Sequence, residues 1–135
     1  MFNKELLKRI GFSDKAVDFI TSNRNYGEMD NPTVKGEHTG KCGDTIITYL
    51  KIEDGIIKDA SFIYTGCSGS AATGSAITEM IKNMSVEDAK KLELKDIVDF
   101  YKDGEEGLPV QKYECGKIAV ESLKNALANF KNSDR

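Results

Sequence analysis

The chain has 135 residues, of which 39% are hydrophobic and 30% charged, and its formal net charge is −3. A chain of this length and composition can bury a core without disulfides, so we expect one domain over residues 1–135. We find no basic stripe that would attract nucleic acid and no apolar run that could cross a bilayer. Three widely spaced cysteines make a poor disulfide framework, which favours a cytoplasmic location and thiol or metal chemistry.

The first third of the chain predicts two short helices and then an irregular segment. Residues 2–22 hold two apolar stretches separated by Gly11, and Ser13 can cap the second stretch. Residues 23–43 are rich in Asn, Gly, Pro, Thr and charge, which is typical of irregular structure. We expect this segment to add no more than one edge strand.

The clearest local pattern is a β-hairpin. Residues 45–52 alternate between apolar and other side chains, residues 54–55 (Asp-Gly) suit a type I′ turn, and a second extended run covers 56–64. Such a turn pairs residues whose numbers sum to 109, and Cys42 and Cys67 satisfy that sum. We therefore expect these two cysteines to face each other at the open end of the hairpin, with Cβ atoms about 4.5–5.5 Å apart. A β-bulge would shift the register but leave both sulfurs at that end.

Helices are expected for most of the remaining chain. After Cys67, small residues lead into an apolar stripe at helical spacing, formed by Ile77, Met80, Ile81 and Met84. Ser85 begins a sequence that resembles a capping box. The other expected segments are helices at 89–92 and 94–101, a polar turn at 102–107, and a last helix from about 116 to 130, just after Cys115. Together these elements predict an α+β fold, in which helices cover one face of an antiparallel sheet of about three strands.

The three cysteines lie in segments that are rich in glycine or charge. A single cysteine in such a domain is usually a small buried apolar residue, but the neighbours of Cys42, Cys67 and Cys115 are unlike core sequence. Cys67 and Cys115 also fall at expected helix N-termini, where unpaired N–H groups favour the thiolate. The thiolate is the form that binds metal and attacks sulfur, so these positions are candidate ligands.

Three thiolates leave a tetrahedral sulfur-rich site one ligand short. Asp44, two residues after Cys42, is the fourth ligand that we favour; Glu114, His38 or a residue of a second subunit are the alternatives. His38 lies in a polar segment, where a solvated side chain is the commoner outcome. A carboxylate suits iron–sulfide units less well than thiolate does, so a site containing Asp44 should release a cluster readily.

These motifs resemble those of the IscU/NifU family of iron–sulfur scaffolds over about residues 13–130. Residues 23–27 (Asn-Arg-Asn-Tyr-Gly) are similar to the family's Asn-Pro-Arg-Asn-x-Gly segment, and residues 42–44 (Cys-Gly-Asp) match its first cysteine motif. Residues 66–67 (Gly-Cys), followed by small residues and a helix, resemble its second motif. Residues 108–115 (Leu-Pro-Val-Gln-Lys-Tyr-Glu-Cys) resemble the Leu-Pro-Pro-Val-Lys-x-His-Cys that precedes the last helix in IscU.

The resemblance implies an IscU/SufE-like fold and the role of an assembly scaffold rather than an enzyme. Such a scaffold builds a [2Fe–2S] cluster on Cys42, Cys67 and Cys115 from iron, electrons and the sulfur of a cysteine desulfurase, and passes it to apo-proteins. Asp44 would help to bind the first metal ion and keep the cluster labile. Two points stay open from the sequence: whether zinc occupies the site in the isolated protein, and whether a cluster is held within one chain or bridges a homodimer.

The sequence departs from the family pattern in two places. Glu114 stands where the family has a histidine, so the family's Cys, Asp, Cys, His set is not carried over. The chaperone-docking Leu-Pro-Pro-Val-Lys is reduced to residues 108–112, which puts recognition by an Hsp70-type chaperone in question. The candidate partner-binding residues are Leu108, Pro109, Val110 and Lys112.

Two other functions remain open from the sequence. A SufU-like sulfurtransferase would hold zinc on the same cysteines and Asp44 and receive a persulfide on one thiol. Proteins of that kind carry a longer insertion between the second and third cysteines than this chain has, which favours the scaffold. A thiol hydrolase or transferase would need His38 within about 2.6–3.2 Å of a cysteine, and nothing in the pattern provides that arrangement.

Overall fold

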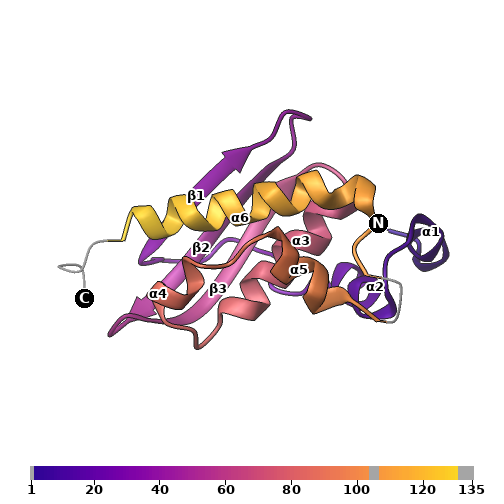
Figure 1. The fold of residues 1–135 in the computed structure, drawn as a ribbon. Helices are drawn as coiled ribbons and strands as arrows, with labels where there is room; N and C mark the ends of the chain where they lie inside the picture. The colour runs from indigo at the N-terminus through magenta and orange to yellow at the C-terminus, as the bar shows by residue number, and fades with distance from the viewer. Residues whose placement is uncertain (1, 104–106, 131–135) are drawn as a thin grey trace.

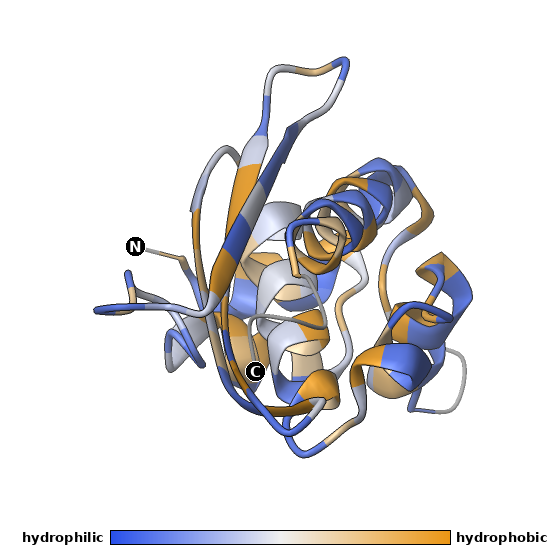
Figure 2. Ribbon diagram, turned by 90° about the vertical axis from the view of Figure 1, so that its left-hand side faces the viewer, coloured by the Kyte–Doolittle hydropathy of each residue, from blue (hydrophilic) through white to orange (hydrophobic). Residues whose placement is uncertain are grey.

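The computed structural model describes residues 2–103 and 107–130. The elements in chain order are α1 (Lys4–Ile10), α2 (Asp14–Thr21), β1 (Val34–Thr39), β2 (Thr45–Glu53), β3 (Ile56–Thr65), α3 (Ser68–Ile81), α4 (Val86–Ala89), α5 (Leu94–Tyr101), the 3₁₀ helix η1 (Val110–Lys112) and α6 (Tyr113–Ala128) (Figure 1). The strands form one antiparallel sheet in the order β1-β2-β3. Figure 2 shows the sheet on one side of the molecule and the main helices beside one of its faces. The predicted α+β fold is confirmed. Within the described ranges, no helix is long and apolar enough to span a membrane.

The two N-terminal helices begin at side-chain caps. The side chain of Asn3 accepts a hydrogen bond from a backbone N–H in the first turn of α1, and Ser13 does the same for α2. Gly11 ends α1 with a positive φ of 117°, a conformation that glycine adopts without steric cost. Both short helices expected within residues 2–22 are therefore confirmed, and so is the capping role of Ser13.

The turn of the β2–β3 hairpin has the predicted geometry. Asp54 and Gly55 have φ values of 53° and 77°, and positive φ at both central positions is the mark of a type I′ turn. Ile52 pairs with Ile57, as the predicted register requires. The strand expected at the edge of the sheet is β1, which pairs with β2.

Beyond the turn, the register of the hairpin shifts by one residue. The shift lies between Lys51 and Ile52, and from there to the open end the paired residue numbers sum to 110, as in Thr45 opposite Thr65. The predicted register, in which Cys42 faces Cys67, is therefore wrong by one residue. Asp44, rather than Cys42, lies next to the segment that leads from β3 into α3.

The core lies between the sheet and the helices α3 and α6. The side of β2 that was predicted to be apolar is buried at all four positions: Ile46, Thr48, Leu50 and Ile52. The helix α6 crosses β1 so closely that a Cβ on Gly36 would collide with the helix backbone at Ala126. The middle of β1 therefore lies directly against the last turns of α6.

The chain between α2 and β1 closes the outer edge of β3. Gly27 N–H donates to the carbonyl of Phe62, whose own N–H donates to the carbonyl of Asn25. The Asn25 side chain donates to Glu79 Oε1 (3.1 Å) and accepts from Lys82 Nζ (2.6 Å), both on or next to α3. This part of the family-like motif thus ties the edge of the sheet to the helix behind it.

The later helices differ from the prediction at their ends. The short helix expected at 89–92 is α4, which begins three residues earlier because Ser85 Oγ accepts from the Asp88 N–H. Met84 lies beyond the end of α3 and packs against the core from there. The helix α6 begins at Tyr113, not at about 116, so that Cys115 lies inside its first turn. The centre of the predicted polar turn, 104–106, falls outside the described residues.

Candidate metal centre

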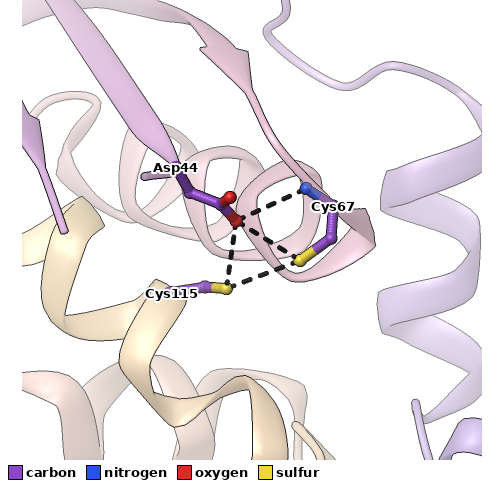
Figure 3. Close-up of side chains that lie close together, drawn as sticks. All are labelled: Asp44, Cys67 and Cys115. Carbon is purple, nitrogen blue, oxygen red and sulfur yellow. Dashed lines mark hydrogen bonds between the residues drawn. The ribbon is translucent and has the colours of Figure 1, made fainter. Parts of the chain in front are cut away.

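Three side chains from separate parts of the chain meet at the open end of the hairpin. Asp44 immediately precedes β2, Cys67 is the N-cap of α3, and Cys115 belongs to the first turn of α6. One ligand atom from each lies within 4.8 Å of the other two. Figure 3 shows the carboxylate and both sulfurs turned toward one another. We call this cluster the Asp44 triad.

The spacing of the triad suits a single tetrahedral ion. The sulfurs of Cys67 and Cys115 are 3.7 Å apart, and Oδ2 of Asp44 lies 3.5 Å from the first and 4.0 Å from the second. With metal–sulfur bonds of about 2.3 Å and a metal–oxygen bond of about 2.1 Å, tetrahedral angles place two sulfurs about 3.8 Å apart and sulfur and oxygen about 3.6 Å apart. The two sulfurs and the carboxylate oxygen therefore match three corners of such a site.

Asp44 is held in place by the N-terminus of α3. Its Oδ2 accepts from the backbone N–H of Cys67 (3.4 Å) and from Ser70 Oγ (3.2 Å). A carboxylate at this position also benefits from the positive end of the helix dipole. Gly66 makes room for it, because a Cβ there would collide with the Asp44 carboxyl group. Ser70 was not among the residues predicted for the site; its place three residues after an expected helix N-terminus was the available signal.

Cys115 differs from the expectation for a thiol at a helix N-terminus. It is buried, and that burial, with a further contribution from the neighbouring Cys67, raises its pKa to about 12. The expected priming of Cys115 as a thiolate is therefore wrong for the metal-free protein. A metal ion that binds Cys115 near neutral pH must displace its proton.

Lys112 also reaches this site. Its Nζ lies 3.4 Å from the sulfur of Cys67, so that a cation stands beside the triad. The sequence motif predicts Lys112 as a partner-binding residue together with three others, Leu108, Pro109 and Val110. Of those, Leu108 and Pro109 are buried and Val110 is 74% exposed.

The remaining candidate ligands lie apart from the triad. Cys42 is exposed in the turn between β1 and β2 and is not part of the 4.8 Å group. His38 is on β1 opposite Ile46, and Glu114 is exposed in the first turn of α6. Among the residues that the structure describes, neither of these two side chains is part of the 4.8 Å group.

Comparison with known proteins shows the family. Residues 11–135 match the NifU-like N-terminal domain. The chain belongs to the NifU-like N-terminal domain family. It is 34% identical over 124 residues to the iron–sulfur cluster assembly protein IscU of Plasmodium falciparum, covering 89% of this chain and 74% of the relative. It is 32% identical over 131 residues to the scaffold protein IscU of Escherichia coli K12, covering 91% and 96%.

A solved structure agrees with the fold of this NifU-like chain. A protein from Fervidobacterium islandicum, described as an iron–sulfur cluster assembly scaffold for the SUF system, aligns with a TM-score of 0.67 at 20% identity, over 88% of this chain and 97% of its own. At that identity the likeness concerns the fold alone. The NifU-like chain thus presents two soft donors, one hard donor and a nearby cation at one end of a sheet.

Proposed function

We propose that this protein is a cytoplasmic scaffold, not an enzyme, on which a [2Fe–2S] cluster is assembled and from which it is transferred to apo-proteins. The observation that carries the proposal is the Asp44 triad, whose three donor atoms stand at metal-binding distances in a chain of this family. The curated relatives are named iron–sulfur cluster assembly proteins. A single hydrophobic core contains residues from α1 through α6, which supports one folded domain.

The proposed ligands are Cys42, Asp44, Cys67 and Cys115. The last three would hold the first iron ion, since they already meet. Cys42 would complete the site from its turn, where Gly43 has a φ of 90° and open space around its Cα. A glycine next to the exposed cysteine gives the turn conformational freedom, so that Cys42 can approach the triad. Sulfur would come from a cysteine desulfurase, and the exposed thiol is the one most open to it.

The composition of the site suits transfer rather than permanent storage. Asp44 is a harder ligand than thiolate and holds iron–sulfide units less firmly. Asp44 and Cys67 are only partly buried, so that a recipient's thiols can reach the cluster from the solvent side. Val110 is the exposed apolar side chain available to a chaperone in the segment 108–112, and a second copy of the chain could share the cluster.

Anaerobic reconstitution tests this proposal. The purified protein is incubated with Fe²⁺, sulfide and a reductant and should develop the absorption bands of a [2Fe–2S] cluster, which it then passes to an apo-ferredoxin. Asp44→Cys should form the cluster but transfer it more slowly, because four thiolates hold it more firmly. Cys115→Ser should not retain it, whereas Asp30→Asn, an exposed carboxylate in the loop before β1, should behave as the parent protein does. A parent protein that gains no cluster would rule the scaffold out.

A second candidate is a zinc-bound sulfurtransferase that works with a desulfurase. The 3.7 Å separation of the two sulfurs, which fits a single ion, favours it. In that reaction the Cys42 thiolate would attack the outer sulfur of the desulfurase persulfide, the sulfur–sulfur bond of the desulfurase would break, and its thiolate would leave. Zinc retention, persulfide labelling of Cys42 and failure to form a cluster would together favour this function over the scaffold.

A further inference from the structure

The side chain of Lys112 is directed into the metal centre by its local backbone. The 3₁₀ helix η1 ends at Lys112, whose N–H donates to the Pro109 carbonyl at 2.8 Å. Pro109 lies against Gly11, and Gln111 donates to the Ile10 carbonyl at 3.2 Å. The segment is thereby fastened to the end of α1. These contacts fix the position of the Lys112 backbone, from which the side chain extends toward the Asp44 triad.

The Lys112 side chain crosses the first turn of α3 at Gly69. A Cβ on Gly69 would stand 2.8 Å from Lys112 Cδ and 2.7 Å from the Cys115 sulfur. The aliphatic stem of Lys112 therefore crosses α3 at a position that only glycine leaves open. From there Nζ reaches Cys67 Sγ at 3.4 Å, and the side chain is partly buried.

The negative charge of a metal ion or cluster bound with its ligands gives a physical reason for a cation next to the Asp44 triad. A divalent ion held by two thiolates and a carboxylate has a net negative charge, and so has a [2Fe–2S] core held by three thiolates and a carboxylate. Among the described residues, Lys112 is the cationic group hydrogen-bonded to the triad. A positive charge next to one sulfur lowers the energy of the loaded state, in a partly buried site where solvent screens charge less than in bulk water.

We propose that Lys112 is a positioning residue for the metal centre, which holds the Cys67 sulfur toward the site and compensates the negative charge of the bound metal or cluster. The proposal deepens the scaffold function and rests on it for the cluster. It also gives Lys112 a role within the chain itself, separate from partner recognition. Its effect should appear with a single metal ion as well as with a cluster.

The test compares four variants in the metal-free protein titrated with Co²⁺, whose thiolate bands report ligation. Lys112→Met keeps the aliphatic stem and removes the charge; it should weaken Co²⁺ binding about tenfold, the size expected for one charge pair in a partly buried site. Lys112→Gln should do the same, and Lys112→Arg should restore most of the affinity. Lys124→Met, on an exposed part of α6, is the matched control for net charge and should bind as the parent protein does.

The cluster provides a second readout. Lys112→Met should lose a reconstituted cluster to a chelator several times faster than the parent protein, and its reduction potential should shift to more negative values, because a nearby cation favours the reduced cluster. Unchanged Co²⁺ affinity in both neutral variants would overturn the proposal, as would an arginine variant that is as weak as they are. If the parent protein binds Co²⁺ but forms no cluster, the scaffold function fails, and the Co²⁺ comparison still decides the role of Lys112.

Discussion

The sulfurs of Cys67 and Cys115 lie 3.7 Å apart, although 48 positions separate the two residues in the chain. The contact joins the first turns of α3 and α6, which approach each other at Gly69. Thr73 Oγ1 reinforces the approach, since it lies 2.8 Å from the Gly69 carbonyl and 3.1 Å from the Cys115 carbonyl. The geometry of the Asp44 triad therefore depends on small and polar residues of α3 as well as on the triad itself.

Gly69→Ala should weaken metal binding without unfolding the protein. The added methyl group would meet the Cys115 sulfur at 2.7 Å, so that the thiol must move away from Cys67. Alanine has the higher helix propensity, by about 1 kcal/mol, which offsets part of the local strain. We expect Co²⁺ affinity to fall at least about tenfold, the free-energy equivalent of about 1.4 kcal/mol, while the circular dichroism spectrum stays that of the parent. Ser68→Ala, in the same turn, is the control; equal affinities for Gly69→Ala and the parent would contradict the expectation.

The cysteines should contribute unequally to the binding of a single metal ion. Cys67 and Cys115 already face Asp44, whereas Cys42 is exposed and apart from them. In zinc titrations with a competing chelator, we expect Cys67→Ser and Cys115→Ser to lose affinity about 100-fold or more, and Cys42→Ser about tenfold or less. Thermal unfolding gives the same ranking, because bound zinc stabilises the folded state in proportion to the logarithm of its excess over Kd. Equal losses for all three serine variants would show that Cys42 joins the site as fully as the other two.

Alternation and capping signals predicted most of the fold. The strand β2 was recognisable from the alternation of its side chains, and the predicted side is the buried one. Ser13 was recognisable as a helix cap because it precedes an apolar helical stretch. The ends of α4 and α6 were less predictable. They depend on which backbone N–H groups find a partner, and α6 is extended at its start by η1, which the sequence pattern did not indicate.

Asp44, Cys67 and Cys115 were predicted to share one site and lie together, whereas Cys42, predicted with them, lies apart. The turn fixed the pairing next to residues 54–55, and the one-residue shift between Lys51 and Ile52 moved Cys42 out of register with Cys67. A β-bulge of this kind leaves little trace in a sequence. The contact of Lys112 with the Asp44 triad was not predicted. It depends on how η1 packs against α1 and on the absence of a side chain at Gly69.

Asp44 should stabilise the metal-free fold as well as bind metal. Its carboxylate accepts hydrogen bonds from Cys67 N–H and Ser70 Oγ at the N-terminus of α3. Loss of a comparable N-terminal partner costs about 1 kcal/mol. In urea unfolding with a chelator present, Asp44→Ala should lower the free energy of unfolding by about that amount, while Asp30→Ala, in an exposed loop, should change it by less than about 0.5 kcal/mol. An Asp44→Ala protein as stable as the parent would show that these contacts add nothing measurable.

Cys115 should make the stability of the metal-free protein fall at high pH. Burial raises its pKa from the ordinary value of 9.0 to about 12, so that the folded state holds this proton more tightly than the unfolded chain does. The stabilisation is therefore fully present below pH 9 and is lost as the pH rises toward 12. The measurement is the difference in unfolding free energy between the parent and Cys115→Ala from pH 7 to 10.5, since lysines and tyrosines titrate alike in both. The two proteins should differ by a constant amount up to about pH 8.5, and the parent's advantage should then decline. A difference that stays constant to pH 10.5 would show that the thiol is not held in its protonated form by the fold.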